Sequence, residues 1–310
     1  MRRIWLAGLA LSGLCGIAAA APYDTGGSNH VRTMLMRAST MIDNGRDTAA
    51  FAKLAAAIRI EPTFALLYAR RAEWEINAGL YTKAEADLAT FATYHPRSRG
   101  LWFLRSLSAL DQGNGAAALT DLAMVASLPD TVHDPDFMEI YGQWSNALYH
   151  ANKSIAEALL HQDDATLADL KAAVDTEAMN TGPILNHYCY TAAVAGLLDL
   201  AELTCQEAIK TQWSNGWEAY DSLAFVELRK HAWQQAIAAY DKSLARNDSL
   251  TLSLYGRGVA RVASGDAGGN NDIARARRIE PDINGIMGRL GAPTLASIST
   301  AAPSQAATHH

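Results

Sequence analysis

Apolar residues recur along the chain with the period of an α-helix, and a longer repeat is superimposed on that period. Gly45, Gly79 and Gly113 are 34 residues apart, and the alanines five residues after them keep the same interval. Segments with apolar residues at helical spacing lie on both sides of each glycine, which tolerates a chain reversal. The pattern therefore predicts an all-α fold, built from helical hairpins that stack on one another.

Large and small side chains also recur at fixed positions within each repeat. When units begin at residues 31, 65, 99, 182, 217 and 251, the eighth position is always small: Ala38, Ala72, Ser106, Cys189, Ala224 and Gly258. The fourth position is large, and the twentieth is alanine in five of the six units. This pattern resembles that of the tetratricopeptide repeats. The resemblance implies a right-handed solenoid of antiparallel helical hairpins, with three repeats in residues 31–132 and three more, plus a short capping helix, in residues 182–290.

Two segments do not keep the repeat. Residues 133–181 have helical composition without the 34-residue interval, which predicts one irregular hairpin in the middle of the solenoid. Such a break could be a hinge or a docking element, or drift without consequence. Residues 291–310 lack periodicity, so we expect a disordered tail.

The first 21 residues have the pattern of a cleavable secretory signal. Two arginines precede an apolar run, and small residues follow it before Pro22. The run is interrupted by glycines and is short for a membrane-spanning anchor, which is the alternative interpretation. Residues 22–30 would then be a linker. We expect a periplasmic or secreted bacterial protein with no stable membrane insertion after cleavage.

Two cysteines of the fourth recognised repeat, Cys189 and Cys205, are equally distant from the predicted turn beside Gly196. They should therefore lie at the same height on facing helices, and in an oxidising compartment we expect a disulfide. Two buried free thiols are the alternative.

Charge and motifs restrict the chemistry. The 310 residues carry a formal net charge of -6 and no predicted helix has a dense basic stripe, which argues against a nucleic-acid partner. No metal-ligand pattern, phosphate-binding loop or nucleophile motif occurs in the sequence. We therefore expect no enzymatic activity, no metal and no cofactor.

Arginine occupies the seventh position of four units, as Arg37, Arg71, Arg105 and Arg257. These side chains could form a ladder of anion-binding groups. Alternatively, their stems lie along the seam between hairpins with the charged heads in water.

The family resemblance also implies that the first helix of each hairpin lines a concave groove. On this basis the predicted partner-binding residues are Phe103, Leu107, Asn186, Tyr190, Asp221, Phe225, Arg229 and Tyr255. Such an apolar and aromatic wall would suit a peptide or helix of another protein. The alternative is that these side chains pack against each other.

The function expected from the sequence is that of an exported scaffold or adaptor in cell-envelope assembly, secretion or transport. Two alternatives stay open: a ligand-binding or enzymatic protein with its site in the irregular middle segment, and a self-associating structural module.

Overall fold

The computed structural model describes residues 27–128, 146–176, 181–211 and 216–300. Within these ranges there are sixteen α-helices and no strands, so the predicted all-α class is confirmed. Fourteen of the helices form seven antiparallel hairpins: α2 (Asn29–Asp43) with α3 (Asp47–Ile60), α4 (Leu66–Asn77) with α5 (Tyr81–Tyr94), α6 (Arg99–Asp111) with α7 (Gly115–Ser127), α9 (Asn146–Leu159) with α10 (Asp163–Thr176), α11 (Thr181–Ala195) with α12 (Leu198–Lys210), α13 (Trp217–Arg229) with α14 (Trp233–Leu244), and α15 (Thr251–Ala263) with α16 (Gly269–Ile279). Two short helices follow, α17 (Ile283–Arg289) and α18 (Leu295–Thr300).

Each hairpin reverses direction at a residue in the left-handed conformation. Glycine supplies this residue in five hairpins, as at Gly45 with φ 71° and Gly79 with φ 69°. In the other two hairpins His161 (φ 56°) and His231 (φ 60°) stand at the same place. A histidine there is strained by the contact of its Cβ with the backbone, which glycine avoids. The two histidines are therefore turn residues.

In most hairpins the small eighth residue on the first helix and a residue sixteen or fifteen positions later on the second helix are both buried. Ala38 and Leu54, like Ala72 and Leu88, are at most 1% exposed. The pair Cys189 and Cys205 occupies the same place in the hairpin α11–α12. Their Cα atoms are 5.1 Å apart and the sulfurs are bonded, so the predicted pairing is present.

The middle hairpin α9–α10 follows the same register from a shifted start. Counting from residue 147, Ser154 is the small eighth residue and His161 is the turn residue. Residue 147 comes 48 positions after residue 99, where the regular interval would be 34. The middle hairpin therefore keeps the register of the other hairpins, and extra residues before it lengthen the interval. The beginning of the predicted irregular segment, 133–145, lies outside the described residues.

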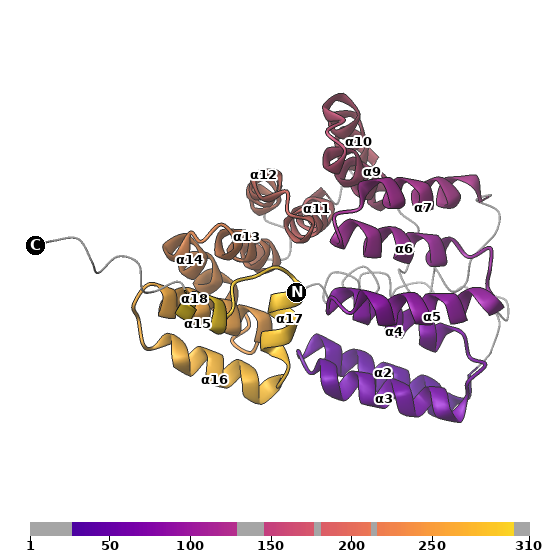
Figure 1. The fold of residues 1–310 in the computed structure, drawn as a ribbon, viewed down its shortest axis with the longest axis horizontal. Helices are drawn as coiled ribbons and strands as arrows, with labels where there is room; N and C mark the ends of the chain where they lie inside the picture. Colours follow the sequence, from indigo (N-terminus) through magenta and orange to yellow (C-terminus); the bar gives the residue numbers. More distant parts are fainter. Residues whose placement is uncertain (1–26, 129–145, 177–180, 212–215, 301–310) are drawn as a thin grey trace, which may run out of the picture.

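The solenoid curves until its first and last hairpins meet. In Figure 1 the hairpins α2–α3, α4–α5 and α6–α7 are stacked on one side and α13–α16 on the other, with α9–α12 joining them. Glu280, which follows α16, accepts hydrogen bonds from the Thr48 amide (2.9 Å) and the Thr48 hydroxyl (2.7 Å) at the start of α3. Because the first amides of a helix have no partner within it, this carboxylate caps α3 from 232 residues away.

The helix α17 makes the second closing contact. Arg289 donates from Nε to the Ala78 carbonyl oxygen at the end of α4 (2.8 Å) and from Nη2 to Asp282 (2.8 Å). Its Cβ lies 2.6 Å from where a side chain at Gly79 would begin, so only glycine fits there. We call these contacts of Glu280 and Arg289 with the first two hairpins the closure seam.

The C-terminal segment differs from the predicted disordered tail over its first part. Ala292 and Pro293 are buried, and α18 spans Leu295–Thr300. The apolar side chains of Leu295 and Ile298 pack against the core cluster, which gives this part of the segment a place to fold. Residues 301–310 and the predicted signal, 1–21, lie outside the described residues. In the part of the chain that is described, no helix is long and apolar enough to cross a membrane.

Candidate interaction surfaces

The residues predicted to line a groove are mostly buried. Phe103, Asn186, Asp221, Phe225 and Tyr255 are each at most 3% exposed, and Tyr190 is 8% exposed. Leu107 and Arg229 are half-buried. The structure thus has the self-packed arrangement at these positions, with no exposed aromatic wall. Whether they ever contact a partner stays a prediction, and such contact would require this face to open.

Neighbouring first helices hold three of these side chains together. The rings of Tyr190 on α11 and Phe225 on α13 stack with centroids 5.4 Å apart. The Arg229 guanidinium lies 6.0 Å from the Phe225 centroid and donates to the carbonyl oxygens of Ala193 and Val194. Burial lowers the pKa of Arg229. These contacts tie one hairpin to the next.

Asp221 lies where the turn of the first hairpin approaches α13 and α15. It accepts a hydrogen bond from the Ser253 hydroxyl and lines a cavity of about 20 Å³ together with Asn44 and Gly45. Burial raises the pKa of Asp221 to about 6, against the weaker effect of the Ser253 hydrogen bond. The carboxyl group therefore titrates in the mildly acidic range.

The short helix α17 covers the inner face of the last hairpin. The Tyr255 hydroxyl donates to Asn284 of α17 and accepts from the Leu295 amide at 3.4 Å. Contact of Tyr255 with a partner stays a prediction, and in this structure the side chain anchors the chain's own C-terminal segment. The sequence predicted the capping helix, but not that its Arg289 reaches the second hairpin or that Glu280, just before it, reaches the first.

The seventh-position arginines were predicted either to form a ladder of anion-binding groups or to lie along the seam between hairpins. Most of them pair with an acidic residue on the second helix of their own hairpin. Arg71 Nη2 lies 2.6 Å from Asp87 Oδ1, and Arg257 Nε lies 2.8 Å from Asp272 Oδ2. Arg105 is 3.6 Å from Asp121. In the middle hairpin the corresponding pair is Lys153 with Asp169, at 2.5 Å, and His150 also contacts this aspartate.

The first hairpin is the exception. In this hairpin the residue sixteen positions after Arg37 is Lys53. Three other hairpins have a cation and an aspartate at this spacing, whereas the first hairpin has two cations. Among the described residues neither Arg37 nor Lys53 has an ion pair or a side-chain hydrogen bond.

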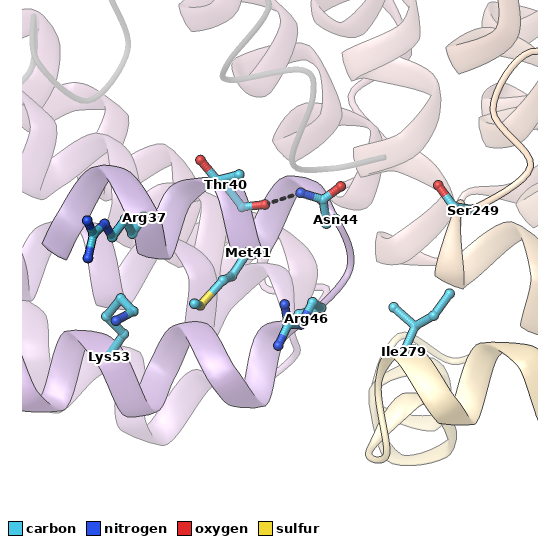
Figure 2. Close-up of a pocket in the computed structure, with 8 residues that line it drawn as sticks. All are labelled: Arg37, Thr40, Met41, Asn44, Arg46, Lys53, Ser249 and Ile279. Atoms are coloured by element: carbon cyan, nitrogen blue, oxygen red, sulfur yellow. Dashed lines mark hydrogen bonds between the residues drawn. The ribbon is translucent and has the colours of Figure 1, made fainter. Parts of the chain in front are cut away.

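These two cations line an open pocket of about 690 Å³ beside the closure seam. Figure 2 shows that α2 and α3 form one wall, and that Ser249 and Ile279 approach from the last hairpins. The remaining lining residues are Thr40, Met41, Asn44 and Arg46. The sequence analysis missed Arg46 and Lys53. The repeat register could have identified Lys53, because the equivalent residues of the next two hairpins, 34 and 68 positions further on, are Asp87 and Asp121.

Among the residues that the structure describes, no group of three histidine, cysteine or carboxylate side chains is arranged to hold a metal ion.

Comparison with known proteins gives a limited match. No family model matches the chain, and no curated protein matches it. Among solved structures, the chain is similar to a tetratricopeptide repeat protein from Parabacteroides merdae, with 14% identity and a TM-score of 0.43, over 85% of this chain and 99% of that one. From its own repeat pattern and its consecutive packed hairpins, the chain has the architecture of a tetratricopeptide-like helical solenoid.

Proposed function

We propose that the protein is a scaffold that binds a segment of another protein. The observation that carries this proposal is the series of seven stacked hairpins. Stacked helical repeats present extended surfaces to which other chains bind. Such a surface needs no cofactor.

We also propose that the scaffold acts outside the cytoplasm, in assembly, secretion or transport at the cell envelope. The N-terminal pattern of residues 1–21 supports export. The cysteine pair is a second support, because disulfides persist in oxidising compartments. Expression of the full chain with its own N-terminus, followed by fractionation and N-terminal sequencing, tests this. A mature chain that begins at Pro22 in the exported fraction is expected, and an uncleaved cytoplasmic chain would contradict it.

Site-specific photo-crosslinking in the native envelope tests the scaffold function. The half-buried Leu107 on the inner face is one labelled position. The matched control is Leu203 on the outer helix α12, which is 62% exposed. We expect a discrete protein adduct from Leu107 and none from Leu203. No adduct from Leu107, or adducts only between copies of this chain, would count against a partner bound at the inner face.

A further inference from the structure

The pocket beside the closure seam has the composition of an anion site. Arg37, Arg46 and Lys53 contribute three positive charges, and none of them has an ion pair among the described residues. Elsewhere in the solenoid a cation at the seventh position is neutralised by an aspartate across its own hairpin. At Arg37 and Lys53 the two facing groups repel each other, and an anion between them would relieve this repulsion.

The remaining lining suits a peptide better than a bare ion. Met41 and Ile279 provide half-buried apolar surface, and Thr40 and Ser249 place exposed hydroxyl groups at the edge of the pocket. A volume of about 690 Å³ is far larger than one small anion needs and accommodates several side chains. The net charge of the whole chain is -6, so these three cations stand out against an acidic background.

We propose that this pocket binds an acidic peptide segment of a partner protein, with its carboxylates between Arg37, Lys53 and Arg46. This inference rests on the proposed scaffold function and names the class of segment that the scaffold holds. A guanidinium can donate two parallel hydrogen bonds to one carboxylate, which favours the two arginines as anchors. The apolar side chains contact the peptide between its acidic residues.

The position of the pocket links binding to closure of the solenoid. Ile279 immediately precedes Glu280, which caps α3 through Thr48. A peptide that contacts α2, α3 and Ile279 together bridges the first and last hairpins. Because it binds the closed form better than the open form, it stabilises the closed form.

A direct binding measurement uses a fluorescein-labelled hexaglutamate peptide and the purified mature chain. The test variant is Lys53→Asp, which gives the first hairpin the same cation and aspartate spacing that is seen at Arg71 and Asp87. The matched control is Arg97→Asp, which makes the same charge change in an exposed turn outside the pocket. Fluorescence anisotropy gives the dissociation constants at two salt concentrations.

We expect Lys53→Asp to weaken hexaglutamate binding about tenfold, because it removes one attraction and adds one repulsion. Arg97→Asp should change the dissociation constant less than twofold. The melting temperature of Lys53→Asp should equal or exceed that of the wild type, which shows that the variant is folded. Binding should also weaken as salt rises.

Three outcomes would overturn the inference: no hexaglutamate binding by the wild type, equal binding by Lys53→Asp, or equal affinity for hexaglutamine. Inorganic phosphate that displaces the peptide at the peptide's own concentration would show that the site takes free anions, and would overturn the peptide assignment. If Lys53→Asp still forms the partner adduct from Leu107, the scaffold function stands and only this pocket's role fails.

Discussion

The contacts between neighbouring hairpins and the contacts at the closure seam are built in different ways. Within the hairpins, small and large apolar side chains are buried together, as Ala72 and Leu88 are, and the same arrangement recurs from unit to unit. At the closure seam a single carboxylate, Glu280, caps a helix, and a single arginine, Arg289, reaches a carbonyl. The repeated contacts hold each unit together, whereas a few polar residues join the two ends of the solenoid.

The largest expected effect comes from a repeated contact. Leu88→Ala removes a side chain that is 1% exposed and leaves a cavity in the core of the hairpin α4–α5. We expect a loss of about 3–4 kcal/mol in the free energy of unfolding, measured by urea denaturation. A loss below about 1 kcal/mol would show that this contact does not hold the hairpin together.

Removing the disulfide should have a slightly smaller effect. The bond joins residues that are 16 apart, and closing a loop of this size contributes about 3 kcal/mol. The double variant Cys189→Ala and Cys205→Ala should lose about this amount in urea denaturation. Reduction of the wild type serves as the control and should lower the denaturation midpoint similarly. An unchanged midpoint after reduction would contradict the contribution assigned to the bond.

Asp221, at the small cavity between the turn of the first hairpin and α15, predicts a dependence on pH. Its pKa is raised to about 6 in the folded state, so the folded protein holds this proton more tightly than the unfolded chain does. The stabilisation from the protonated carboxyl is present below about pH 4 and is lost as the pH rises through 6. Asp221→Asn should therefore gain about 2 kcal/mol relative to the wild type between pH 4 and pH 8. Parallel unfolding curves at the two pH values check this, and an equal difference at both would refute it.

The smallest stability effect is expected at the cap between the two ends of the solenoid. Glu280→Ala leaves the Thr48 amide and hydroxyl without the carboxylate that accepts from them. Loss of a helix cap costs about 1 kcal/mol. Asp282→Ala is the control, since it removes a nearby carboxylate that pairs with Arg289 and leaves Glu280 in place. A loss as large as that of Leu88→Ala would contradict the interpretation of Glu280 as a single helix cap.

The sequence predicts the repeated features of the fold well, because the same residue types recur at the same positions in several units. The hairpins, the turn at Gly45 and its equivalents, and the pairing of Cys189 with Cys205 all follow from the register. The His161 turn escaped notice because histidine at a left-handed position gives no such signal. The shifted start of its hairpin added to the difficulty.

The candidate site was less accessible to sequence reasoning. Burial of Tyr255 depends on where the solenoid's curvature carries α17, and small rotations between hairpins add up over seven units. Glu280 of the closure seam and Lys53 of the pocket each occur in one unit only, so no repetition identifies them. Their roles follow from contacts between segments that are far apart in the chain.

Amide hydrogen exchange at Thr48 tests closure of the solenoid most directly. This amide lies in the first turn of α3 and donates to Glu280, so its protection depends on contact between the two ends. The closed solenoid predicts slow exchange at Thr48 in the wild type and exchange at least tenfold faster in Glu280→Ala, with the Leu54 amide in the interior of α3 unchanged. Rapid, unprotected exchange at Thr48 in the wild type would show that the first and last hairpins do not meet in solution.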